Sequence, residues 1–405
     1  MDTMQKKRFE ALREVIASRA GDYRAAAEAQ SRVWEDAAGE TQRRMWEDAA
    51  RFNKIGTDTG DGPPLLLTAG LPEPYDGFDR YNPGEIHHDK DKMLLNGMLD
   101  MAGAAFGGMQ AVPSLRANMG CGIFPSMFPG IKQRLFYDAR MPWVVEHLSK
   151  ERISALGDGD IGETDEFKLA LEHMEYLAAQ TAGTGAFVYP LDVQGPFDIA
   201  HLVYGDAIFY DLYDDPPFIR HLMDLSRHAI ITGLEECLKR IPGSDEYIAH
   251  YNSVALPRSL GGIKLSEDTS TLISNDHLDE YAVPATARVL DHFGGGYVHY
   301  CGKHEGLFER LLGLPLVRGF NFGNPEFHDM DAMLARMASA GKVYYGGVNA
   351  LPGETRRGFF ARVRNSATAH DNRPNGAPRL LLQYHARFEE RGQVCEDWRA
   401  AGEPA

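Results

Sequence analysis

Cysteine is scarce in this chain, and its scarcity excludes a fold that depends on disulfide cross-links. The 405 residues contain four, Cys121, Cys237, Cys301 and Cys395, which are too few to form a disulfide framework at this length. A reducing cytoplasm is therefore the expected location of the protein. In that compartment a cysteine is usually a packed apolar residue or a metal ligand.

Positive charge is also in short supply. The chain has 42 lysine and arginine residues against 58 aspartate and glutamate residues, and its formal net charge is −16. This balance, with no dense basic block anywhere, excludes the electrostatic footprint of a nucleic-acid-binding protein. We therefore expect a small-molecule substrate and no nucleic acid among the partners. The oligomeric state, a homodimer included, stays open.

Long apolar runs are absent as well. No stretch approaches the roughly 18 uninterrupted apolar residues of a membrane span, so no membrane partner is expected. The first residues, "MDTMQKKRFEALREV", lack the apolar segment of a signal peptide. The glycine clusters do not form the G-x-G-x-x-G pattern of a dinucleotide site. Because 43% of the residues are hydrophobic and 25% are charged, we expect a globular protein with a sizeable core.

Strand-like runs alternate with helix-length segments along most of the chain. The strand candidates are residues 107–115, 186–193, 247–254, 261–268, 295–301, 316–322, 342–348 and 379–384. Such alternation indicates a parallel sheet, and about eight repeats indicate a single (β/α)8 TIM barrel of the α/β class. Residues 249–268 hold two apolar runs with no helix between them, so the strand count there stays open.

An N-terminal helical extension is expected to precede the barrel. Residues 1–55 are rich in Ala, Glu, Arg and Gln, which favour helices. The Gly/Pro/Asp-rich stretch "GTDTGDGPP" then ends the helical pattern. We therefore divide the chain into a helical extension over 1–60 and a barrel over 61–405.

Polar side chains gather directly after the predicted strands. They are Arg116, Asn118, Asp192, Gln194, Asp268, His299, Cys301, Asn321, Asn349 and His385. In a barrel, the carboxyl ends of the strands and the loops that follow them form the active-site mouth. Each residue alone is more often structural, and Asp192 and Asn349 are equally suited to capping a turn or a helix, but a set from so many strand ends favours one shared site.

Particular roles can be assigned within this set. Arg116 is expected to meet a substrate anion, and Asp268 to orient a metal ligand or bind substrate, so these two are the candidate catalytic residues. His299 and Cys301 stand two apart at a strand end, and side chains two apart on an extended chain point to the same side. Both could therefore bind one metal ion. The candidate substrate-binding residues are Asn118, Asp192, Gln194, Asn321 and Asn349.

Three stretches, in this order, resemble the uroporphyrinogen decarboxylase superfamily. They are "LDVQGPFDIAHLVYGDAIFYDLYDDPPFIRHLMDLS" (191–226), "IKLSEDTSTLIS" (263–274) and "HYCG" (299–302). They match the superfamily's Gly-Pro-Phe-x-x-Ala turn, its acidic residue before a Ser-containing helix start, and its H-x-C-G turn. The resemblance covers roughly 90–400. It implies one (β/α)8 barrel with its pocket at the C-terminal mouth.

Within that superfamily the chain departs from the true decarboxylases. Those carry an arginine-rich motif, Arg-x-Pro-x-Trp-x-Met-Arg-Gln-Ala-Gly-Arg, and an aspartate on the first barrel strand. This sequence lacks the motif, and "AVPSLRANMGCG" (111–122), taken as the first-strand segment, offers no aspartate. The chain is more similar to the cobamide-dependent methyltransferases and to uncharacterised members that carry "RANMG" and "PFDIA"-type segments.

The methyltransferase resemblance implies a zinc site. Those enzymes hold zinc with a His-x-Cys pair and a cysteine near the last strand, and His299 and Cys301 match the pair. At the third position this chain has His385, directly after "RLLLQY" (379–384), whereas Cys395 lies in a helix-like stretch. We take His385 as the third ligand, or as a polar pocket residue, because a residue beyond the loop rarely reaches the mouth.

The expected function is a zinc-dependent methyltransferase of the corrinoid-linked type. It would move a methyl group between a corrinoid protein, or a small methylated substrate, and an acceptor. No D-x-H-x-x-G motif is present, so the corrinoid would be carried by a separate protein. A metal-free decarboxylase of a small carboxylate and a non-catalytic small-molecule-binding barrel are the alternatives. The residues identify neither the substrate nor the methyl acceptor.

Overall fold

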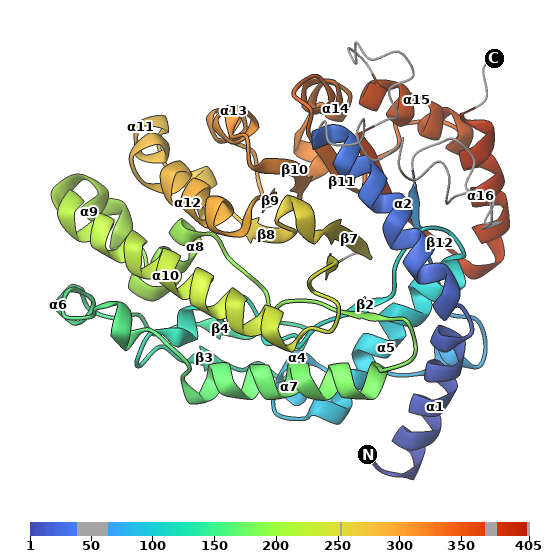
Figure 1. The fold of residues 1–405 in the computed structure, drawn as a ribbon, viewed down its shortest axis with the longest axis horizontal. Helices are drawn as coiled ribbons and strands as arrows, with labels where there is room; N and C mark the ends of the chain where they lie inside the picture. The colour runs from blue at the N-terminus through green and yellow to red at the C-terminus, as the bar shows by residue number, and fades with distance from the viewer. Residues whose placement is uncertain (39–63, 252, 369–378, 403–405) are drawn as a thin grey trace.

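The computed structural model describes residues 1–38, 64–251, 253–368 and 379–402, which form a mixed α/β fold (Figure 1). Its centre is a parallel six-stranded sheet with the strand order β1-β12-β11-β10-β9-β8. In chain order the strands are β1 (Leu65–Ala69), β8 (Ile263–Ser266), β9 (Gly296–Tyr300), β10 (Val317–Phe322), β11 (Val343–Gly346) and β12 (Leu380–Ala386). These strands are largely apolar and buried on both faces, as expected when helices cover a parallel sheet.

Two further parallel strands continue this arrangement. Strand β2 (Ser114–Leu115) pairs with β5 (Phe187–Val188), and a single parallel bridge from Gln194 to Ser266 links the chain after β5 to β8. In the described part of the chain no ladder joins β1 to β2. The fold is therefore barrel-like, with strand hydrogen bonds that do not run continuously around it.

Two antiparallel hairpins stand outside the parallel set. One pairs β3 (Gln133–Arg134) with β4 (Trp143–Val144), and the other pairs β6 (Tyr247–His250) with β7 (Val254–Pro257). The β6–β7 hairpin occupies the place of a predicted barrel strand. Its tip faces β2, where the Ser114 hydroxyl donates to the His250 carbonyl oxygen at 3.2 Å.

Helices connect the strands and cover the sheet. Their bounds are α4 (Pro83–His87), α5 (Lys90–Gly107), α6 (Lys150–Ser154), α7 (Asp165–Thr181), α8 (Pro196–Tyr204), α9 (Ile208–Asp214), α10 (Pro216–Arg240), α11 (Asn275–His277), α12 (Val283–Phe293), α13 (Glu305–Gly313), α14 (Met330–Ser339), α15 (Arg356–Thr368) and α16 (Arg391–Ala400). Helix α10 shows how local sequence starts a helix, because the Asp215 carboxylate caps its first turn and Pro216 is its first residue. No helix in the described ranges is long and apolar enough to cross a membrane.

The N-terminal helices α1 (Thr3–Ala17) and α2 (Ala20–Ala38) pack directly on this core. Figure 1 shows α2 beside β7, β11 and β12, which it contacts. The buried Gln30 amide donates to the carbonyl oxygens of Gln110 (2.7 Å) and Ser253 (3.1 Å) and accepts from the Ala255 N–H (2.7 Å). Trp34 stacks on Tyr297 with 6.4 Å between ring centroids. The boundary predicted at residue 60 lies in 39–63, outside the described residues.

The strand prediction differs from the structure in several places. The run at 247–254 is not a barrel strand, because its first half forms β6, which pairs antiparallel with β7 beginning at the end of the run. Strand β1, "LLLTA" at 65–69, was missed because this short apolar run follows immediately after a Gly/Pro/Asp-rich stretch. Of the run at 107–115 only Ser114–Leu115 is a strand. Arg116 therefore follows the second parallel strand of the chain and not the first.

Candidate functional site

Three potential metal ligands meet at the carboxyl ends of β8 and β9. Within the described residues, Asp268, His299 and Cys301 form the one group of three His, Cys, Asp or Glu side chains whose ligand atoms all lie within 4.8 Å of one another. His299 Nε2 is 3.6 Å from Cys301 Sγ and 3.8 Å from Asp268 Oδ1. The spacing of two residues at the end of β9 does bring the histidine and the cysteine to one point.

The orientation of His299 is fixed by Asn321 on the neighbouring strand β10. The Asn321 side-chain N–H donates to the Tyr345 carbonyl oxygen at 2.7 Å, so its side-chain oxygen faces His299. That oxygen lies 2.6 Å from His299 Nδ1 and can only accept, so the proton is on Nδ1. Nε2 therefore carries the lone pair and directs it at Cys301 and Asp268. A ring nitrogen held in this way is ready to bind a metal.

Asp268 is held in place by its own backbone and by its carboxylate. Its N–H donates to the buried Asp198 carboxylate at 2.8 Å, and the Thr269 N–H does so at 2.6 Å. Its Oδ1 accepts from the Cys301 N–H at 2.5 Å. These bonds tie the loop after β8 to the end of β9, so the two loops carry the three ligands as one unit.

A second buried acid lies behind Asp268. Burial raises the pKa of Glu267 to about 7, and its oxygens accept from the hydroxyls of Ser270 (2.6 Å) and Thr286. Burial, with the nearby charges of Glu267 and Asp268, also raises the pKa of Asp198 well above its ordinary value. Carboxylates crowded in this way favour a nearby cation.

The protonation states of His299 and Cys301 suit metal binding. Burial, then the charge of Lys264, lowers the pKa of His299, so its imidazole is neutral at pH 7. Burial, then the Asp268 carboxylate, raises the pKa of Cys301 to about 11. Cys301 is therefore a thiol in the protein alone and would release its proton to a bound dication. A glycine leaves the necessary room, because a Cβ at Gly323 would stand 2.5 Å from Cys301 Sγ.

The cluster opens into a cavity of about 570 Å³ that Asp268, His299, Asn321, Asp192 and Gln194 help to line. A largely buried charge trio of Arg116, Asp192 and Lys264 forms one side of this cavity. Asp192 Oδ1 is 3.0 Å from Arg116 Nη1 and 3.1 Å from Lys264 Nζ. Burial would raise the pKa of Asp192, but the two cations outweigh it and hold the pKa well below its ordinary value. The trio carries one positive charge in excess, which favours an anionic ligand.

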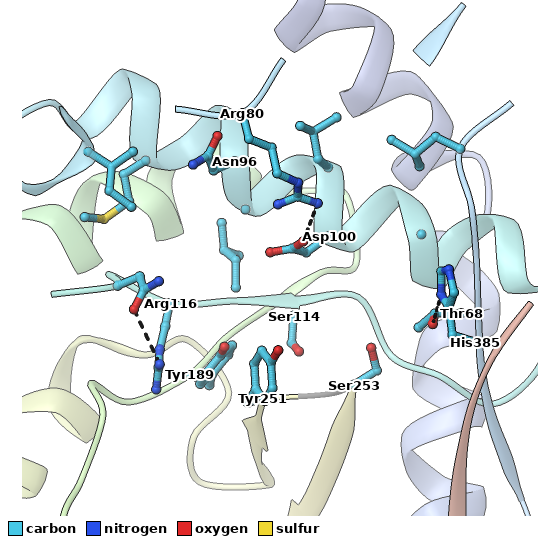
Figure 2. A pocket seen from close by; sticks show the side chains of 18 of the residues that line it. Thr68, Arg80, Asn96, Asp100, Ser114, Arg116, Tyr189, Tyr251, Ser253 and His385 are labelled. Atoms are coloured by element: carbon cyan, nitrogen blue, oxygen red, sulfur yellow. Dashed lines mark hydrogen bonds and ion pairs between the residues drawn. The ribbon is translucent and has the colours of Figure 1, made fainter. Parts of the chain in front are cut away.

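A second cavity, of about 500 Å³, lies between β1 and β2. Figure 2 shows His385 and Thr68 at one end of it, with His385 Nδ1 and Thr68 Oγ1 3.0 Å apart. Asn118 lines this cavity as well, and its side-chain oxygen lies 3.4 Å from Arg116 Nη2. The linings of the two cavities have Arg116, Tyr189 and Tyr251 in common.

The structure separates some of the predicted site residues. His385 lines the second cavity and is not part of the His299–Cys301 group, whose third member is Asp268. Cys395 lies on α16, partly buried against the core, and does not complete the group either. Asn349 is exposed and lines neither cavity, and its carbonyl oxygen accepts from Arg362 at 3.2 Å.

Lys264, Asp198 and Glu267 were not predicted from the sequence. Lys264 stands inside the apolar strand "IKLS", and Asp198 stands inside the apolar segment "PFDIA". A charged residue that interrupts a buried run is a usable signal, because burying an unpaired charge is costly. Glu267 gives no such signal, since it adjoins Asp268 in a stretch typical of a polar helix start.

Comparison with known proteins places the fold. No protein-family model and no curated protein matches the sequence. The structure of a methyltransferase from Methanosarcina mazei is similar over 92% of this chain and 98% of that chain, with a TM-score of 0.59 and 12% identity. A second similar structure is that of a GH138 enzyme targeting pectin rhamnogalacturonan II. It is 12% identical over 88% of this chain and 37% of that chain, with a TM-score of 0.35. On the first of these two likenesses, the chain has a methyltransferase-like fold.

Proposed function

We propose that this protein is a zinc-dependent methyltransferase of the corrinoid-linked type, with zinc held by Asp268, His299 and Cys301. The observation that carries the proposal is the convergence of these three ligand atoms within 4.8 Å of one another at the strand ends of a methyltransferase-like fold. The proposal keeps the predicted His-x-Cys pair and replaces His385 by Asp268 as the third ligand.

The donor set fits zinc. One imidazole nitrogen, one thiolate sulfur and one carboxylate oxygen are ligands that this ion accepts in a four-coordinate site. Three protein ligands leave a fourth position, where bound zinc would bring an incoming thiol to its nucleophilic thiolate form. Asn321 keeps His299 Nε2 directed at that site, and the bonds to Asp198 keep the Asp268 loop against β9.

The chain's other residues would bind the substrate. Arg116 and Lys264 share the single carboxylate of Asp192, and their excess positive charge would hold one anionic group of the substrate beside the cluster. Gln194 adds an amide to the same wall. Buried tyrosines at the floor, Tyr297 and Tyr345, close the cavity below and keep water out.

The corrinoid would be carried by a separate protein that docks at the mouth of the barrel. The methyl group would pass between that protein, or a small methylated substrate, and the acceptor. The order of the motifs at 191–226, 263–274 and 299–302 supports membership of the uroporphyrinogen decarboxylase superfamily on the methyltransferase side. The methyltransferase-like fold supports the methyltransferase part of the proposal.

Zinc content together with methyl transfer tests the proposal. We expect close to one zinc per chain and transfer of the methyl group of methylcobalamin to a small thiol. Asp268→Ala and Cys301→Ser should each lose most of the metal and the transfer, while His385→Ala should keep the metal. A metal-free protein that releases CO2 from a small carboxylate would favour the decarboxylase instead. A metal-free protein without turnover would favour a binding barrel.

A further inference from the structure

The second cavity lies where the parallel strands separate. Between β1 and β2 no ladder forms in the described residues, and helix α5 covers one side of the space (Figure 2). The side chains of Met93 and Leu99 on α5 make this side apolar, and the opposite side, the floor of the cavity, carries hydroxyl groups. A concave space with one apolar wall and a few converging polar groups is the usual form of a small-molecule site.

The floor is built by the tip of the β6–β7 hairpin. Tyr251 and Ser253 line the cavity there, beside Ser114 from β2 (Figure 2). Ser253 has a φ of 64°, and it is the one non-glycine residue with positive φ in the described chain. Its carbonyl oxygen accepts from the Val112 N–H (3.2 Å) and from Gln30 (3.1 Å), which hold this unfavourable conformation. Backbone strain that is held by its surroundings is typical of functional positions.

The tyrosine at this tip is available to a ligand. Tyr251 is 62% exposed although it lines a cavity, whereas Tyr189 beside it is 6% exposed. The two rings form a surface on which a flat or apolar molecule can pack. Arg116 stands over the Tyr189 ring, with 5.8 Å from its guanidinium carbon to the ring centroid. The aromatic surface formed by Tyr251 and Tyr189 therefore ends at the Arg116 guanidinium.

The charges of the cavity favour one anionic group. Arg80 and Asp100 at the entrance neutralise each other across 2.7 Å. Arg116 belongs to the trio in which Asp192 also pairs with Lys264, so one positive charge is left over. An anion at the Arg116 end of the cavity would balance that charge.

We infer that this cavity is a second binding site, distinct from the metal cluster, for a small molecule with a flat or apolar body and one carboxylate. The body packs between Tyr251 and the apolar residues of α5, and the carboxylate lies at the Arg116 end beside Asn118. His385 and Thr68 close the opposite end (Figure 2). The site does not depend on the metal, but it shares Arg116 with the substrate anion of the proposed function, so the two anions would compete for the same positive charge.

Benzoate and its neutral analogue benzamide are matched probes for this site. We expect calorimetry to give a Kd below about 1 mM for benzoate and about tenfold weaker binding of benzamide. Tyr251→Ala and Asn118→Leu should each weaken benzoate binding by about fivefold or more. Tyr210→Ala, on the exposed face of α9, is the matched tyrosine control and should leave it unchanged.

A variant of the metal cluster distinguishes the two cavities. His299→Ala should keep benzoate binding, because His299 lines only the other cavity. Loss of benzoate binding in His299→Ala together with full binding in Asn118→Leu would move the ligand to the metal cavity and overturn the inference. Equal binding of benzoate and benzamide, or no binding of benzoate at millimolar concentration, would overturn it too.

Discussion

Replacing Asn321 by alanine removes the contact that fixes the His299 ring. In the folded protein the Asn321 side-chain oxygen accepts from His299 Nδ1 at 2.6 Å, and its N–H is committed to the Tyr345 carbonyl oxygen at 2.7 Å. Without this partner the ring can rotate and the proton can move to Nε2. The nitrogen that would bind zinc then has to be reoriented before it can donate its lone pair.

The size of the effect follows from this geometry. Loss of the group that orients a metal-binding histidine typically lowers metal affinity about 10–100-fold, or about 1.4–2.7 kcal/mol. The Tyr345 carbonyl oxygen also loses its partner in a buried place, which costs about 1–3 kcal/mol of folding stability. Asn321→Ala should therefore weaken zinc binding at least tenfold in a protein that still folds.

Competition with a zinc-binding chromophore measures this affinity, and circular dichroism confirms that the variant is folded. Asn349→Ala is the matched control, since Asn349 is exposed and lines neither cavity. We expect it to bind zinc as tightly as the unmodified protein does. An Asn321→Ala protein that is folded and binds zinc with undiminished affinity would refute the role given to Asn321.

Three further predictions concern other parts of the molecule. Arg116→Gln should weaken binding of an anionic substrate about tenfold without unfolding the chain, whereas a large drop in Tm with unchanged binding would mark its contact with Asp192 as structural. Burial, then the charge of His88, lowers the pKa of His87 to about 4, so the folded protein holds fewer protons than the unfolded chain between pH 4 and 6.5. The free energy of unfolding should therefore fall as the pH drops through that range, and His87→Gln should remove on the order of 2 kcal/mol of this fall. Gln30→Leu removes the partner of the Gln110 carbonyl oxygen and of the Ala255 N–H, while the Ser253 carbonyl oxygen keeps the Val112 N–H, so urea unfolding should report a loss of about 2 kcal/mol or more.

The fold class could be predicted from the sequence because parallel strands leave a clear pattern. Buried runs such as 316–322 and 342–348 alternate with helices, and they do form β10 and β11. The hairpin at β6 and β7 could not be recognised, since antiparallel strands buried on both faces have the same apolar pattern as a single parallel one. Whether β1 and β2 pair depends on how distant parts of the chain come together, and no local pattern reports that they do not pair in the described residues.

The candidate site was predictable in part for a related reason. His299 and Cys301 share one strand end, so the period of an extended chain was enough to bring their side chains together. The third member comes from another strand, and its identity depends on how β8 and β9 pair in register. Asp268 was predicted to orient a metal ligand or bind substrate, and His385 was preferred as the third ligand because of its position after the last strand. The separation of β12 from the cluster appears only in three dimensions.

X-ray absorption at the zinc edge of the purified protein tests the central claim most directly. If Asp268, His299 and Cys301 hold the metal, the spectrum should show one sulfur ligand, from Cys301, with nitrogen and oxygen completing a tetrahedral site. Cys301→Ser should lose that sulfur and most of the zinc, and Cys395→Ala should change neither. Two sulfur ligands per zinc, or a Cys301→Ser protein that keeps its full zinc content, would contradict the account.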